Sequence, residues 1–214
     1  MAVGTTAANI RTRRRRYVPG AERRQQILDA AATFFSRRGF AGTTTRQIAK
    51  ALGISETLLF RHFPTKESLY EAILENLVPE ADFERWLGEL RRLADKRDDG
   101  GLFTAIARAV MRSYRDDAVY HRLVLFASLE DHDLARTAHS KHAAPVVAFL
   151  REYVSRRQAE GAFRRMPPDV VVHMVLHVPA QFAQWKALGV NPLGLTERAI
   201  AAHIRTVLHG CMAH

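Results

Sequence analysis

The chain has 214 residues, 47% of them apolar, which suffices for one compact body or for a small domain joined to a larger one. Its single cysteine, Cys211, excludes an internal disulfide bond and a thiolate metal cage, as is typical of a reducing cytoplasm. The longest uncharged apolar run, residues 170–185, is too short to cross a bilayer. We therefore expect a soluble, cytoplasmic protein without a membrane partner.

The net charge of +10 is confined to the first third of the chain. Residues 1–66 hold 13 Lys and Arg against three acidic residues, whereas residues 67–214 hold 19 basic and 19 acidic residues. A polyanion such as DNA is the natural partner of the basic part, because each phosphate neutralised by Lys or Arg releases condensed counterions. A merely solvated basic tail does not explain why the excess extends into sequence that looks folded.

The first 20 residues lack any apolar period and are predicted to form a disordered basic arm. Its arginine run, RTRRRR at residues 11–16, admits two interpretations. It is a clamp for the minor groove or for phosphates, or it is a solvated charge run. The sequence leaves both open.

Apolar residues recur at helical spacing from residue 21 and predict a first helix over residues 21–38. Arg37 and Arg38 fall in its last turn and Gly39 comes directly after it, as expected where a helix ends. Thr44 and Gln47 form a capping-box pair, so a second helix is predicted to begin at residue 44 or 45. Gly53 is predicted to end it.

Ser55 caps a predicted third helix, which Pro64 stops because the residue before a proline is pushed out of the α region. Thr65 caps a fourth helix that starts at Lys66. Glycines and prolines divide the remainder into six further predicted helices, at about 81–96, 102–116, 118–131, 137–160, 168–187 and 195–209. No segment alternates with a period of two, so the predicted fold class is all-α, with about nine or ten helices.

The second and third helices are short and are joined by a turn that contains Gly53. Isolated helices under ~12 residues are marginal in water, so these two need neighbours to brace them. Such a pair is typical of a helix-turn-helix, whose second helix enters the major groove of DNA. A short helical hairpin in any bundle is the alternative, but it does not predict a positive charge confined to the same end.

The stretch ILDAAATFFSRRGFAGTTTRQIAKALGISETLLFRHFPTKESLYEAIL, residues 27–74, resembles the N-terminal domain of TetR-family transcriptional regulators. The resemblance rests on RGF, TT, IAKALGIS and HFPTKE in that order. It implies a three-helix helix-turn-helix domain over residues 21–66 and a helical ligand-binding and dimerisation domain over residues 67–214. It also implies a homodimer, an operator with two half-sites, and repression relieved by a small hydrophobic molecule.

Carried onto this chain, the resemblance implies a DNA-facing set of nine residues: Thr45, Arg46, Ser55, Glu56, Thr57, Phe60, Arg61, His62 and Lys66. Hydroxyls and cations suit phosphates, and an arginine can read guanine through a bidentate contact worth about 1–3 kcal/mol. Two of the nine depart from the family pattern, which often has lysine or proline at Glu56 and tyrosine at Phe60. Glu56 is expected to accept from a cytosine or to point away, and Phe60 is expected to touch a thymine methyl group.

The predicted helix at 168–187 carries apolar residues at heptad-like spacing. In the family the last long helices form a four-helix dimer interface. The residues expected to form it here are Val171, Val175, Val178, Phe182, Ile200, Ile204 and Val207. Core packing within one chain is the equal alternative for each of them.

Aromatic and histidine side chains of the second domain are candidates for the lining of a ligand cavity: Trp86, Phe103, Tyr114, Phe126, His173, His177 and Trp185. Ordinary core packing is the alternative for each aromatic residue. His173 and His177 lie four residues apart and could share a metal ion, but no third ligand is in view. We therefore expect no metal and no cofactor.

Enzyme classes receive no support, because the sequence has no glycine-rich phosphate loop, H-E-x-x-H or G-x-S-x-G motif. Two functions from different classes remain. The first is a DNA-binding repressor released by a small hydrophobic ligand. The second is an architectural or partner-recruiting DNA-binding protein, which needs no cavity. Activation in place of repression also stays open.

Overall fold

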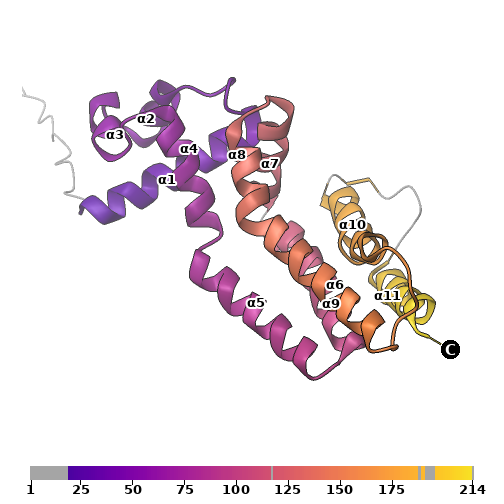
Figure 1. The fold of residues 1–214 in the computed structure, drawn as a ribbon. Helices are drawn as coiled ribbons and strands as arrows, with labels where there is room; N and C mark the ends of the chain where they lie inside the picture. Colours follow the sequence, from indigo (N-terminus) through magenta and orange to yellow (C-terminus); the bar gives the residue numbers. More distant parts are fainter. Residues whose placement is uncertain (1–18, 117, 188, 191–195, 214) are drawn as a thin grey trace, which may run out of the picture.

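The computed structural model describes residues 19–116, 118–187, 189–190 and 196–213. Within this part, the chain forms eleven α-helices and one π-helical turn, which confirms the all-α prediction (Figure 1). The described residues include no helix long and apolar enough to cross a membrane. The arginine run at 11–16 lies outside them, so both interpretations of the arm stay open.

The first four helices begin and end close to where the capping signals predict, at Gly20–Arg38 (α1), Thr45–Leu52 (α2), Glu56–His62 (α3) and Lys66–Leu77 (α4). The capping box at the start of α2 is present, because the Thr44 side chain accepts from the Gln47 N–H and the Gln47 side chain accepts from the Thr44 N–H. Ser55 and Thr65 likewise accept from backbone N–H groups three residues later. Local hydrogen bonds therefore set these boundaries.

The remaining elements are α5 Glu80–Asp95, α6 Asp99–Asp116, α7 Ala118–Leu129, α8 Asp133–Ala138, the π-helical turn His139–Ala143, α9 Ala144–Ala159, α10 Pro168–Ala187 and α11 Glu197–Cys211. The single helix predicted at 137–160 is thus divided. Its division falls next to Pro145, which has no N–H to donate, and the Ala144 N–H bonds to the His139 carbonyl five residues back.

Two apolar cores lie one beyond the other along the molecule. The first joins α1 to α4 with α7 and α8, and Phe35, Leu59, Tyr70 and Leu123 are buried in it. The second joins α5, α6, α9, α10 and α11. Although the predicted domain boundary lies at residue 66, α4 packs in the first core, so the N-terminal unit includes this helix as well.

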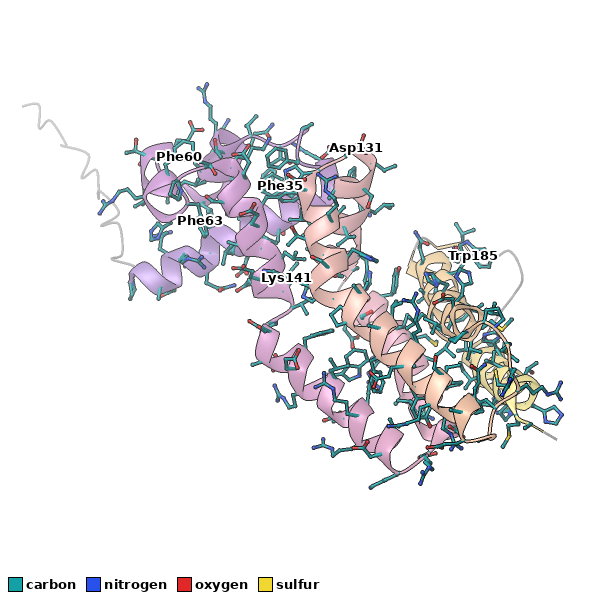
Figure 2. All side chains as sticks on the ribbon, in the orientation of Figure 1. Phe35, Phe60, Phe63, Asp131, Lys141 and Trp185 are labelled. Atoms are coloured by element: carbon teal, nitrogen blue, oxygen red, sulfur yellow. The ribbon has the colours of Figure 1, made fainter. Side chains whose placement is uncertain are left out.

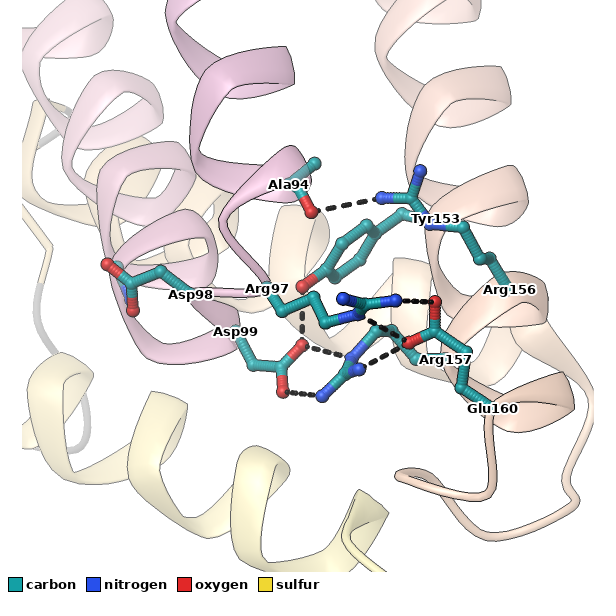
Figure 3. Close-up of polar contacts among 9 residues, drawn as sticks. Ala94, Arg97, Asp98, Asp99, Tyr153, Arg156, Arg157 and Glu160 are labelled. Atoms are coloured by element: carbon teal, nitrogen blue, oxygen red, sulfur yellow. Dashed lines mark hydrogen bonds and ion pairs between the residues drawn. The ribbon is translucent and has the colours of Figure 1, made fainter.

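A buried ion pair ties the start of α6 to the end of α9 (Figure 3). The guanidinium of Arg157 donates to both carboxylate oxygens of Asp99 at 2.9 Å, and the Tyr153 hydroxyl donates to the same carboxylate. The side chains of Arg157 and Asp99 are only 11% and 13% exposed. The hydrogen bond to Asp99 raises the pKa of Arg157, so the charged form is strongly favoured at this helix junction.

Candidate nucleic-acid interface and ligand cavity

The third helix has one buried face and one face in solvent. Leu59 is fully buried and Phe63, the residue after α3, is 2% exposed. On the other face, Phe60 is 40% exposed and Thr57 and Arg61 are exposed as well (Figure 2). The apolar face therefore anchors α3 to the first core and leaves the opposite face free to meet a partner.

The turn between α2 and α3 sets the angle at which α3 leaves the core. Gly53 has φ +63° and ψ +30°, the left-handed conformation that ends many helices and that favours glycine. The N–H groups of Gly53 and Ile54 bond back to carbonyls of Lys50 and Ala49 at 3.1 and 3.0 Å. This tight turn is the one predicted from the sequence, and it holds α2 against α3.

Glu56 is turned toward the start of α2. Its Oε1 accepts a hydrogen bond of 2.5 Å from the Thr45 hydroxyl. Thr45 gives its only side-chain proton to this bond and cannot donate it to a phosphate at the same time. Of the two expectations for Glu56, the structure favours a carboxylate directed away from open solvent, since both side chains are half-buried.

Lys66 is the first residue of α4, as predicted. Its Nζ is 4.0 Å from the centroid of the Phe40 ring, a cation–π contact. Burial lowers the pKa of this ammonium group. The side chain is half-buried, and its contact with a phosphate stays a prediction.

The other predicted DNA-facing side chains divide in the same way. Arg46 and Ser55 are exposed beside α3, and the Ser55 hydroxyl also caps the helix by accepting from the Leu58 N–H at 3.1 Å. His62 is half-buried. The structure thus brings together one exposed set around α3, namely Arg46, Ser55, Thr57, Phe60 and Arg61.

The end of α7 holds the turn between α1 and α2. Glu130 accepts from the Phe40 N–H at 2.8 Å, and Arg122 donates to the Ser36 carbonyl at 2.7 Å. Gly39 has φ +72°, a conformation that favours glycine, and a Cβ there would lie 2.2 Å from a Glu130 oxygen. These contacts join α7 to the turn that precedes α2.

A cavity of about 640 Å³ lies between α6, α10 and α11, at the far end of the molecule from α3 (Figure 1). Its floor is apolar and buried, with Ala107, Phe182, Ile200 and Ile204. Its lining also includes five cationic side chains, which are exposed and mark the mouth: Arg108, Arg112, Arg115, Lys186 and Arg198.

Comparison with known proteins decides the family. Residues 27–73, which contain α2 and α3, match the model of the bacterial regulatory proteins of the tetR family. The HTH-type transcriptional repressor KstR2 of Mycolicibacterium smegmatis is 32% identical over 162 residues, which cover 72% of this chain and 73% of that protein. The chain belongs to the TetR family.

Two solved structures share the fold of this TetR-family chain. AibR, in complex with isovaleryl coenzyme A and operator DNA, aligns with a TM-score of 0.65 at 24% identity and covers 89% of this chain and 100% of its own. A transcriptional regulator from Saccharomonospora viridis in complex with choline aligns with a TM-score of 0.64 at 21% identity, covering 91% and 100%. At these identities, the likeness concerns the fold.

The cavity of this TetR-family chain is not where the aromatic pattern predicted. Of the seven predicted side chains, Tyr114 lines it. Phe103 is fully buried in the second core, with its ring centroid 6.2 Å from that of Phe163. Trp86 packs at a tilt against Phe83, with ring centroids 5.9 Å apart. Aromatic side chains at helical spacing are thus mostly core here.

The other predicted lining residues also lie outside the cavity. Phe126 is beside Gly39 at the junction with the first core, and Trp185 is half-buried near the end of α10 (Figure 2). His173 and His177 are exposed on α10 and stack on one another with ring centroids 4.2 Å apart. Among the described residues, no group of three potential ligands that could hold a metal ion is present.

The cationic mouth was not predicted from the sequence, although a signal for it is present there. Arg108, Arg112 and Arg115 follow one another at intervals of four and three residues, which places them on one face of α6. Without the fold, such a stripe is indistinguishable from a solvated helix face. Only the packing of α10 and α11 beside it turns the stripe into the wall of a cavity.

The predicted dimer seam packs inside the single chain. Six of its residues are 5% exposed or less: Val171, Val175, Phe182, Ile200, Ile204 and Val207. Val178 is half-buried. The seam faces the interior of the same chain, where α10 packs mainly against α6. Core packing within one chain accounts for the burial of these residues, and their place in a dimer interface stays a prediction.

Proposed function

We propose that this TetR-family chain is a transcriptional repressor that binds operator DNA through α3 and leaves it when a small molecule occupies the cavity. The observation that carries the proposal is the outward face of α3, where Thr57, Phe60 and Arg61 are exposed while Leu59 is fixed in the core. A helix presented in this way can enter the major groove, where the base pairs are distinguishable. We assign it no catalytic step and no metal, and we place it in the cytoplasm, where it reaches DNA.

The relatives support this proposal without fixing its ligand. KstR2 is named a repressor, and the AibR structure holds both a coenzyme A ester and operator DNA. The structure of the Saccharomonospora viridis regulator holds choline, which is a cation. The chemistry of the effector therefore has to come from the cavity of this chain.

The cavity also separates the two functions that the sequence left open. An architectural DNA-binding protein without an effector needs only a filled core in its second domain. A volume of about 640 Å³ lies within the range of about 300–1,000 Å³ that is typical of small-molecule sites. The observation favours the ligand-responsive repressor.

We propose that the repressor acts as a homodimer, so that two copies of α3 reach half-sites about 34–36 Å apart on the duplex. Because the predicted seam is buried, the contact is better placed on the outer face of α10, where Val170 and Met174 are 43% and 40% exposed. Light scattering should then give twice the chain mass, and Met174→Glu should shift the mass toward the monomer. A monomer for the unaltered chain would contradict the dimer.

The DNA-binding part is tested by fluorescence anisotropy with labelled duplexes from the region upstream of its own gene. We expect binding that weakens with salt, and a loss of about 5- to 150-fold for Arg61→Ala if this arginine reads a base, corresponding to about 1–3 kcal/mol. Arg91→Ala on α5, also exposed, is the matched control and should leave the affinity unchanged. Failure to bind any fragment at low salt would rule the repressor out.

A further inference from the structure

The cavity has an unusual charge for the domain that contains it. Residues 67–214 carry equal numbers of basic and acidic side chains. The described lining nevertheless contains five cations and no carboxylate. A typical part of the surface of a neutral domain carries both acidic and basic side chains. The cavity lining carries basic ones, so the electrostatic potential there is positive.

Two of these five cations have no side-chain partner among the described residues. Arg115 forms an ion pair with Asp116 at 2.7 Å, and Asp116 also lies close enough to Arg112 to feel its charge. Within the described part of the chain, neither Arg108 nor Arg198 has an ion pair or a hydrogen bond to a side chain. Arginine presents a planar fork that matches phosphate and carboxylate oxygens, so these two are suited to an anionic ligand.

The floor below the cations is apolar. Ala107, Phe182, Ile200 and Ile204 line it and are each 5% exposed or less. Half-buried Met111 adds a flexible apolar side chain between the floor and the arginines. The space thus has two chemistries, with an apolar end inside and a cationic end at the surface.

We propose that the cavity binds an acyl chain joined to a head group that carries several phosphates, the chemistry of an acyl coenzyme A thioester. The acyl chain lies on the floor between α6, α10 and α11, and the phosphates meet Arg108, Arg112 and Arg198 at the mouth. The head group has several negative charges because a single carboxylate would leave most of the cationic mouth uncompensated. This ligand class replaces the small hydrophobic molecule expected from the sequence.

The cationic mouth is not an extension of the DNA-binding surface. Figure 1 shows α10 and α11 at the opposite end of the molecule from α2 and α3, with α7 and α8 between them. A duplex in contact with α3 therefore does not reach the mouth of the cavity. The positive charge there is therefore available to a different anion.

Isothermal titration calorimetry on the full chain without DNA tests the ligand class. The probes are octanoyl coenzyme A, coenzyme A, octanoate and choline. We expect octanoyl coenzyme A to bind at least tenfold more tightly than coenzyme A or octanoate, and choline not to bind. If octanoate binds as tightly as octanoyl coenzyme A, the phosphates of the head group do not contribute and this part of the proposal is overturned. If coenzyme A binds as tightly as octanoyl coenzyme A, the acyl chain does not contribute and the role of the apolar floor is overturned.

Variants locate the site. Arg108→Gln with Arg198→Gln should weaken octanoyl coenzyme A by tenfold or more, whereas Arg205→Gln, an exposed arginine on α11 outside the lining, should not. Circular dichroism confirms that each variant is folded. As a second measurement, the logarithm of the affinity should fall less steeply with salt in the double variant than in the unaltered chain, because fewer charged contacts remain. An unchanged affinity and salt dependence would overturn the site.

That this ligand relieves repression rests on the proposed function. That the cavity binds the ligand does not. If octanoyl coenzyme A binds but a preformed complex with DNA persists, the ligand class stands and release from DNA fails. If DNA binds and no thioester does, the repressor stands and the ligand class is overturned.

Discussion

His121 lies in the wall between α6 and α7, close to the cavity. Its ring stacks on Tyr114 with centroids 3.5 Å apart, and its Nε2 is 3.0 Å from the Ser113 hydroxyl. Burial lowers the pKa of His121 to about 4, from an ordinary value of 6.5. The imidazole is therefore neutral in the folded protein across the physiological range.

This residue should make the protein sensitive to acid. Between pH 6.5 and 4 the unfolded chain binds a proton at His121 and the folded chain does not, so the free energy of unfolding falls as the pH is lowered through this window. His121→Phe keeps a ring in the stack without a titrating group. Urea unfolding at several pH values should show a shallower decline for this variant between pH 6.5 and 4.

The matched control is His139→Phe, because His139 is exposed in the π-helical turn. It should leave the pH dependence as in the unaltered chain. Burial also lowers the pKa of His142, so part of the decline should remain in both variants. An identical decline for His121→Phe and the unaltered chain would contradict the role assigned to His121.

At the level of single residues, the sequence predicts what local hydrogen bonds decide. Thr44 with Gln47, Gly53 and Ser55 all act within a few positions of themselves, and each is found as predicted. The contact between Lys66 and the Phe40 ring was not predicted, because it is set by the fold and not by nearby sequence. A charged side chain beside a helix start is compatible with either environment.

Among the helices, the joint between α6 and α9 should depend on the buried pair of Asp99 and Arg157. Arg157→Ala leaves the Asp99 carboxylate, 13% exposed, without its main partner. Removing one partner of a buried ion pair typically costs about 3–5 kcal/mol. Urea unfolding should show a loss in this range.

Arg136→Ala is the comparison for this loss. Arg136 forms an ion pair with Asp133 in α8, and both side chains are more than two-thirds exposed. Exposed pairs contribute about 0–1 kcal/mol, so this variant should unfold nearly as the unaltered chain does. An equal loss of unfolding free energy in the two variants would show that burial of the Asp99–Arg157 pair adds nothing to stability.

The positions of the helices were more predictable than the helices against which each one packs. Apolar spacing identified the inward side of α10 but not which helix covers it, and α6 of the same chain does so. The π-helical turn His139–Ala143 was not predicted, because it has no buried residue and its hydrogen bonds leave no mark in the apolar spacing. Periodicity tells which residues share a face, whereas packing over long sequence distances decides what that face meets.

Across the whole molecule, the cavity and α3 are connected through α7. The cavity lining includes Ala118 at the start of α7, and Glu130, which follows its end, holds the turn before α2. A ligand that prefers one position of α7 would shift the balance between DNA-binding and released states by its difference in affinity for the two. The confinement of net charge to residues 1–66, visible in the sequence, predicts that this end meets DNA.

Hydrogen–deuterium exchange of the chain with and without a bound duplex tests the DNA-binding surface most directly. If α3 docks in the major groove, the amides of residues 44–63 should exchange more slowly in the complex than in the free chain. The amides of α10, which lies far from α3, should exchange at nearly the same rate in both. Protection confined to residues outside 44–63, with α3 exchanging as in the free chain, would contradict the DNA-binding role of this helix.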